Sequence, residues 1–293
     1  MNTITFNCQS ITPILMHGAN GKTAELRPAS IKGVLRFWWR AIHGNLPLKE
    51  LKEKEGEIFG SMDKKSKLII FPIEVTETKD YPISPTPHHR EGYCSSTKQN
   101  CFHFNKNTKL CKKATLKTAK IYDFTLKMMI KPNLHMTEEQ LKNLFILATT
   151  LGGFGQRSRR GFGSVKIIGS EVLTSHEEVE TLIKTINPKF NKGLKKSKEE
   201  QYPYIRKIEI GKNKNNIDDL LYKISKATHD NKCGKALFKD DRLASPIYVS
   251  ILEFGENDYR PIIITLNCVS EKYVNFKDML KRQKAFKEAI LNG

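Results

Sequence analysis

Apolar residues in the first half of the chain recur at spacings typical of strands and helices. Residues 2–8 alternate polar and apolar side chains, as a half-buried strand does. A helix is predicted over residues 31–43 after Ser30, and a second helix after Thr137, whose spacing to Gln140 is that of a capping box. The predicted strands cover residues 2–8, 67–75, 119–131 and 164–169. The predicted order is strand, helix, strand, strand, helix, strand.

The second half of the chain has a related but less regular pattern. Strands are predicted over 204–210, 246–254 and 261–267, and helices over 175–186, 217–227 and 274–291. We therefore predict an α+β fold of two tandem ferredoxin-like (RRM-like) βαββαβ units, of which the second need not be complete. The first domain covers residues 1–170, with a glycine-rich loop and a long insertion, and the second covers residues 171–293.

The insertion at residues 76–117 shows little periodicity and contains a cluster of cysteines and histidines. Soft ligands at this density are able to hold a tetrahedral zinc ion, although no CxxC pair is present. Two readings stay open, a structural zinc site and a metal-free, reduced loop; no other cofactor is required. The candidate ligands are Cys94, Cys101, His103 and Cys111.

The segment 151–165 combines glycine, arginine and phenylalanine. Its five glycines allow unusual backbone torsions and close approaches, and its three arginines suit phosphate oxygens. Phe154 and Phe162 offer faces on which a base can stack. This composition predicts a loop that holds a nucleic-acid backbone; the alternative is a solvated turn anchored by its phenylalanines. A dinucleotide fingerprint is excluded, because Ser158 replaces the third glycine and the preceding element is helical.

The helix predicted over residues 31–43 has an apolar stripe and a basic stripe. The basic stripe consists of Lys32, Arg36, Arg40 and His43, with Arg27 just before the helix. Trp39 flanks this stripe, where it either stacks on a base or belongs to the core with its neighbour. The helix and the glycine-rich loop are therefore expected to form two walls of one RNA groove.

Charge favours an anionic partner. The chain carries 50 Lys and Arg against 31 Asp and Glu, a formal net charge of +19 with a pI near 9.6. Such an excess attracts polyanions but does not choose among RNA, DNA and anionic membranes. No signal peptide or bilayer-spanning apolar run is seen, so we expect a cytoplasmic protein without a membrane partner.

Catalytic chemistry finds little support in the residue pattern. The paired aspartates at 218–219 and 240–241 stand beside turns and helix starts, where Asp is common for capping alone. Metal-independent RNA cleavage needs a histidine beside a cation, and His17 and His43 are the candidates. RNA binding without catalysis is favoured, and single-stranded RNA suits the predicted sheets and loops better than duplex DNA.

Three segments carry a resemblance to a known family. Residues 25–41 (ELRPASIKGVLRFWWRA) resemble the signature of the first Cmr subunit of type III-B CRISPR effector complexes. Residues 152–165 resemble the glycine-rich loop of the wider RAMP (repeat-associated mysterious protein) superfamily, and residues 242–246 are similar to a further segment of the Cmr family. The resemblance implies two ferredoxin-like folds, assembly with other Cmr subunits, and a position near the 3′ end of the guide RNA.

The resemblance also implies a role in capturing target RNA without cutting it. Guide RNA and single-stranded target RNA are the expected ligands. Two alternatives stay open: a metal-independent endoribonuclease that processes guide RNA, and an adaptor whose basic surface meets acidic proteins. The expected RNA contacts are Arg27, Lys32, Arg36, Trp39, Arg40, Phe154, Arg157, Arg159 and Arg160.

Overall fold

The first of two main antiparallel sheets is built around a long central strand. In the computed structural model, one edge of β9 (Ala119–Ile130) pairs with β1, and β1 pairs in turn with β10. The other edge of β9 pairs with β2, β3 and β4. These strands are β1 (Ile4–Ser10), β2 (Ile14–Leu15), β3 (Leu68–Ile70), β4 (Glu74–Asp80) and β10 (Val165–Ile167). The structure describes residues 3–18, 20, 23–80, 93–94, 99–100, 104–105, 110–111, 119–132, 136–194, 202–231, 245–267 and 276–292.

The alternation in β1 turns one face of this sheet inward. Ile4, Phe6 and Cys8 are buried, and the residues between them face outward. Cys8 lies opposite Phe124 in β9. Burial raises the pKa of the Cys8 thiol to about 12, so this cysteine acts as a small apolar core residue.

Helices cover the inner face of the first sheet. Their bounds are α1 (Pro28–Ile42), α2 (Leu48–Phe59), α3 (Glu138–Leu151) and α4 (His176–Ile186). Proline near the start of α1 favours initiation there. At α3 both arms of the capping box form: Gln140 N donates to Thr137 Oγ1 over 3.1 Å, and Thr137 N donates to Gln140 Oε1 over 3.0 Å. Ser175 caps α4.

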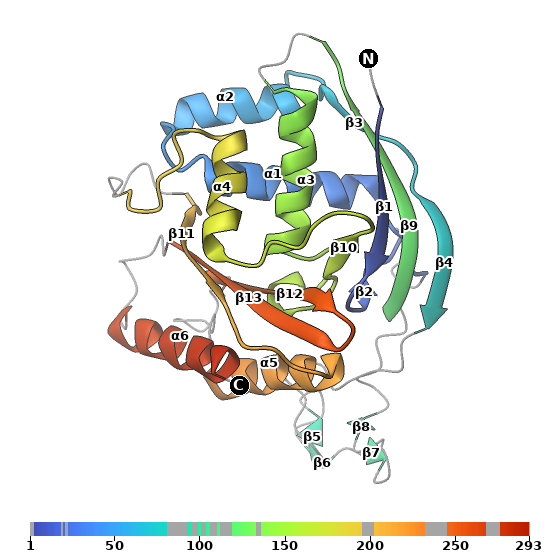
Figure 1. Cartoon of the computed structure of the whole chain (residues 1–293), viewed down its shortest axis with the longest axis vertical. Coiled ribbons are helices and arrows are strands. Elements are labelled where there is room, and N and C mark those ends of the chain that lie inside the picture. Colours follow the sequence, from blue (N-terminus) through green and yellow to red (C-terminus); the bar gives the residue numbers. More distant parts are fainter. Residues whose placement is uncertain are drawn as a thin grey trace.

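The second sheet has the order β11-β13-β12, and its edge strand β12 is buried on both faces over most of its length. It consists of β11 (Ile205–Ile210), β12 (Ile247–Gly255) and β13 (Asp258–Leu266), with α5 (Ile217–Asn231) and α6 (Phe276–Leu291) as its helices. Tyr248 and Leu252 of β12 join the core shared with the first sheet, whereas Val249 and Ile251 face the other way. Figure 1 shows α1, α3 and α4 between the two sheets and α5 and α6 on the far side of the second.

The pattern-based predictions for most elements are confirmed, with two corrections. The strand predicted over 67–75 is divided into β3 and β4, because Pro72 lies in the break between them. Helix α2 was not predicted. Within the insertion at 76–117 the structure describes the end of β4 and two short ladders, β5 (Tyr93–Cys94) with β6 (Gln99–Asn100) and β7 (Phe104–Asn105) with β8 (Leu110–Cys111). The candidate zinc ligands Cys101 and His103, and the side chains of Cys94 and Cys111, lie outside the described residues, so zinc stays a prediction.

Candidate nucleic-acid interface

The glycine-rich loop packs against itself. Phe154 N donates to Gly163 O over 2.9 Å, so residues on its two arms lie in direct contact. Gly163 has φ +73°, and a Cβ there would lie 2.0 Å from Phe154 O. A Cβ on Gly153 would lie 2.3 Å from Phe162 O. The predicted need for glycine is therefore correct, but the close approaches are made by the chain itself rather than by a phosphate.

The same loop is bonded to the second sheet. Gly161 N donates to Val249 O over 2.8 Å, and Ile251 N donates to Ser164 Oγ over 3.0 Å. Thr12 Oγ1, from the turn after β1, donates to Gly161 O over 2.7 Å. All these groups lie in the interior, where unmatched polar atoms are expensive. The loop is thus a connector between the two sheets.

Two of the loop's arginines, in the 3₁₀ turn η2 (Ser158–Arg160), face the second sheet. Arg160 is 8% exposed; its Nη1 donates to Ile247 O over 2.9 Å, and its guanidinium lies 4.9 Å from the Phe286 ring centre. The prediction of Arg160 as an RNA contact is therefore wrong, because its side chain is buried against the second sheet. Arg159 donates to Ser245 O over 3.0 Å and lies over the Tyr248 ring, yet it is partly exposed.

The aromatic residues expected to stack on bases belong to the core. Phe154 is fully buried and stacks on Phe145, and Phe162 packs into the core beneath the second sheet. Trp39 is 3% exposed, with its ring 4.1 Å from the His43 ring. The stacking roles predicted for Trp39, Phe154 and Phe162 are wrong, because no ring face is open to a ligand in this conformation.

The end of β2 lies between Arg27 and the loop residues Gln156 and Arg157. Gln156 N donates to Leu15 O over 2.8 Å, and Arg27 N donates to Met16 Sδ over 3.3 Å on the other side. Arg157 adopts the left-handed conformation at φ 60°, and burial lowers the pKa of its guanidinium. Arg27 is exposed at the start of α1. The structure therefore brings the loop and the start of the basic helix to neighbouring positions.

Lys32 lies on the basic stripe of α1 and is held by hydrogen bonds. Its Nζ donates to Leu68 O over 2.7 Å and to Ser66 Oγ over 3.0 Å. Burial lowers the pKa of this ammonium group. Lys32 thus ties α1 to the start of β3 while adding charge to the same face.

Further along α1, Arg36 and Arg40 share one carboxylate. Glu55 of α2, 1% exposed as a side chain, accepts from Arg36 Nε and, over 2.6 Å, from Arg40 Nη2. Arg40 Nε also donates to Glu55 Oε2 over 3.2 Å. The two arginine side chains are 40% and 39% exposed. Each guanidinium is therefore held by the buried Glu55 carboxylate while part of it faces solvent.

His43 is unsuited to acid–base chemistry at this surface. Its Nδ1–H donates to Trp39 O over 2.6 Å, and burial lowers the pKa of the ring to about 4. The imidazole is therefore neutral near pH 7, and it is partly buried. The other histidine candidate, His17, has Gln156 Nε2 3.1 Å from its Nε2.

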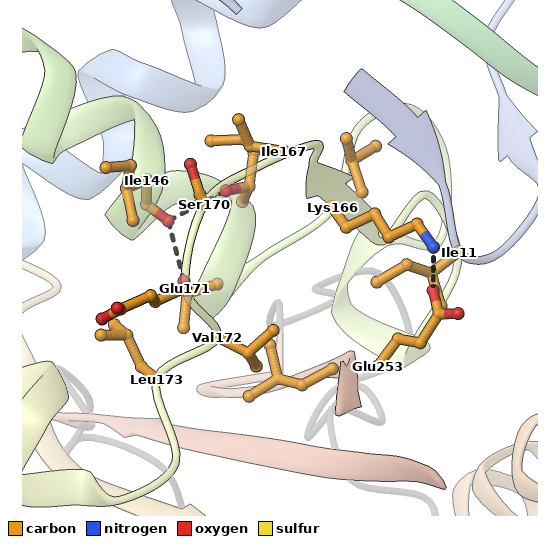
Figure 2. Close-up of a pocket in the computed structure, with 13 residues that line it drawn as sticks. Ile11, Ile146, Lys166, Ile167, Ser170, Glu171, Val172, Leu173 and Glu253 are labelled. Carbon is orange, nitrogen blue, oxygen red and sulfur yellow. Dashed lines mark hydrogen bonds and ion pairs between the residues drawn. The ribbon is translucent and has the colours of Figure 1, made fainter. Parts of the chain in front are cut away.

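A small cavity between α3, β10 and β12 has the wrong character for RNA. Figure 2 shows the ion pair of Lys166 with Glu253 across it, at 2.8 Å. Its volume is about 40 Å³, whereas ligand pockets commonly measure roughly 300–1,000 Å³. Among the residues that the structure describes, no three His, Cys, Asp or Glu side chains gather to hold a metal, and no helix is long and apolar enough to cross a membrane.

Comparison with known proteins assigns the family. Residues 7–166, more than half of the chain, match the model of the RAMP superfamily. The chain belongs to the RAMP superfamily. Within it, the chain is 32% identical over 176 residues to CRISPR system Cmr subunit Cmr1-2 of Pyrococcus furiosus, a match covering 55% of this chain and 93% of the relative. Subunit Cmr1-1 of the same organism is 26% identical over 299 residues, covering 88% and 86%. The predicted resemblance of the chain to the first Cmr subunit of type III-B complexes is confirmed.

Solved structures share the fold over nearly the whole chain. The apo crystal structure of Cmr1 from Pyrococcus furiosus superposes with a TM-score of 0.60 at 20% identity, covering 99% of this chain and 96% of that one. A chain in the cryo-EM structure of type III-B Cmr-beta bound to cognate target RNA gives 0.59 at 13% identity, covering 98% and 99%. The arrangement of the two sheets is thus that of solved Cmr proteins.

Glu55 is the residue of this RAMP chain that sequence reasoning missed. It follows Leu51 and precedes Ile58 on the inner face of α2, an apolar stripe in which an acid is out of place. Buried Glu is rare unless it is paired, so a Glu within an apolar stripe indicates a basic partner elsewhere in the fold. Tyr248, which supports Arg159, carried no comparable signal because its burial depends on the second sheet.

Proposed function

We propose that this RAMP protein is a non-catalytic RNA-binding subunit of a type III-B Cmr ribonucleoprotein. The observation that carries the proposal is the basic character of α1. From Arg27 at its cap to Arg40 the helix bears four cations and no acidic residue, and the only acid bonded to it among the described residues, Glu55, is buried. With the net charge of +19, this face suits the phosphates of a single strand.

The proposed partners are other Cmr subunits, guide RNA and single-stranded target RNA. The chain is proposed to lie near the 3′ end of the guide and to help capture the target. Support comes from the Cmr1 relatives and from the fold shared with a chain of the Cmr-beta complex bound to cognate target RNA. The RNA contacts retained are Arg27, Lys32, Arg36, Arg40, Arg157 and Arg159, all with side chains that are not fully buried.

We also propose that residues 1–170 and 171–293 are two ferredoxin-like units. In the first, β1, β4, β9 and β10 take the order β10-β1-β9-β4 around helices α1 and α3, as in a βαββαβ unit. In the second, the order β11-β13-β12 fits the same unit without its last strand in the described part of the chain. The core shared by both sheets makes the two units one packed body.

Binding without cleavage is tested in one incubation. Full-length protein is mixed with end-labelled guide-repeat RNA in EDTA and resolved on native and denaturing gels. We expect a shifted complex of intact RNA. Products ending in a 2′,3′-cyclic phosphate that disappear in His17→Ala, but persist in the control His176→Ala on the surface of α4, would instead identify an endoribonuclease.

A further inference from the structure

The outer face of α1 contains a glycine that the fold does not require. Gly33 is exposed in the middle of the helix, and a Cβ built there meets nothing within 4 Å. Alanine is strongly preferred over glycine in a helix interior, so the chain gives up helix stability at this position. Glycine is used where another group must come close to the backbone, and at Gly33 such a group would have to come from outside the chain.

Arg36 and Arg40 lie on the same face, three and seven residues after Gly33. Helical side chains lean toward the N-terminus, so Arg36 covers the turn that contains Gly33. Arg36 donates a hydrogen bond to Glu55 through Nε, and Arg40 donates to the same carboxylate through Nε and Nη2. Within the described part of the chain, both terminal amino groups of Arg36 and Nη1 of Arg40 make no hydrogen bond and remain available to a ligand.

We propose that Glu55 is a positioning residue that holds Arg36 and Arg40 as a seat for one RNA phosphate, reached beside Gly33. Guanidinium groups bind phosphate through paired N–H groups, and an arginine already held in place loses less freedom on binding. The cluster of two arginines and one glutamate keeps a charge of +1, which favours an anion. This inference rests on the proposed RNA-binding function and assigns one of its contacts.

Substitution of Glu55 distinguishes a positioning role of its carboxylate from the effect of its negative charge on RNA affinity. Glu55→Gln keeps the size of the side chain and removes a negative charge next to the seat. If Glu55 acts only as a counter-charge, this variant binds RNA more tightly than the wild type. If Glu55 positions the arginines, it binds about tenfold more weakly despite the added positive charge.

Gly33→Gln tests the same seat without touching the ion pairs. Glutamine is a good helix former, so the thermal midpoint is expected to stay the same or rise while RNA affinity falls about tenfold. The matched control is Gly255→Gln at the end of β12, an exposed glycine where a Cβ also meets nothing within 4 Å. That control is expected to bind RNA as the wild type does.

The measurement is fluorescence anisotropy of labelled single-stranded RNA with the full-length protein, alongside thermal unfolding of each variant. Weaker binding by folded Glu55→Gln and Gly33→Gln, with Gly255→Gln unchanged, supports the seat. Unchanged or tighter binding by folded Glu55→Gln, or unchanged binding by Gly33→Gln, overturns it. If the wild type itself fails to bind RNA, the proposed function fails instead, so the two failures are distinguishable.

Discussion

Arg160 and Glu55 hold a charged group in the interior and His43 holds a partly buried ring, and each of the three is stabilised in a different way. Arg160 donates to a backbone carbonyl and lies against an aromatic ring, whereas Glu55 accepts from two arginines. His43 remains neutral instead. Removing one partner of such a group leaves the other unmatched, which costs about 3–5 kcal/mol for a buried ion pair.

The neutral state of His43 predicts a dependence of stability on pH. Its pKa is about 4 in the folded chain, below the usual 6.5, so between these values only the unfolded chain takes up the proton. The contribution is complete above pH 6.5 and is lost as the pH falls toward 4. Between pH 7 and pH 5 we expect this group to lower the free energy of unfolding by about 2 kcal/mol.

Urea unfolding at pH 7 and pH 5 measures this loss in the wild type and in His43→Gln. The variant lacks the titrating ring, so the decrease between the two pH values is expected to be smaller by about 2 kcal/mol. An equal decrease in both proteins would show that His43 titrates normally in the fold.

At the scale of elements, the glycine-rich loop joins the two sheets. It crosses itself at Phe154 and Gly163 and bonds to β12 through Gly161 and Ser164. The positive φ angles and close backbone contacts of this loop are made with other parts of the chain, so its glycines are needed for packing. Of the three arginines in this loop, Arg157 and Arg159 are partly exposed, and these two remain the proposed RNA contacts.

Alanine substitution of two glycines with similar positive φ angles tests this role. Gly163 has φ +73° with the Phe154 carbonyl in the way, whereas Gly169 has φ +82° with open space around it. Gly169→Ala is expected to lose only the left-handed penalty of about 1–2 kcal/mol. Gly163→Ala adds a backbone clash and is expected to lose more than about 3 kcal/mol in urea unfolding. Equal losses would contradict the connector role.

Local patterns predicted most elements because their causes are local. The alternation in β1 and the capping box of α3 are written in adjacent residues. Helix α2 was not predicted because Glu55 interrupts its apolar stripe, and the arginine partners of Glu55 lie on α1. The burial of Trp39 and Phe154 likewise depends on distant segments, so composition alone gave them a ligand role that packing excludes.

At the scale of the whole molecule, the positive net charge is consistent with the proposed RNA partner. The chain is a RAMP protein with a net charge of +19, and its basic helix α1 lies next to the segment that bears Arg157. The two sheets fix these positions through a common core. About five phosphate contacts on this face would give single-stranded RNA affinity a slope of about −3.5 against salt on logarithmic axes.

The most direct test compares two variants with the same net charge. Arg36→Gln, Arg40→Gln and Glu55→Gln together remove the arginine pair without stranding a buried acid, and lower the net charge by one. Lys281→Gln, at an exposed position of α6, lowers it equally. Single-stranded RNA affinity of the full-length proteins is measured from low to moderate salt. We predict that the triple variant binds at least tenfold more weakly, with a slope shallower by about 0.7 for the one phosphate lost, while Lys281→Gln matches the wild type. Equal affinities and slopes for all three proteins would contradict it.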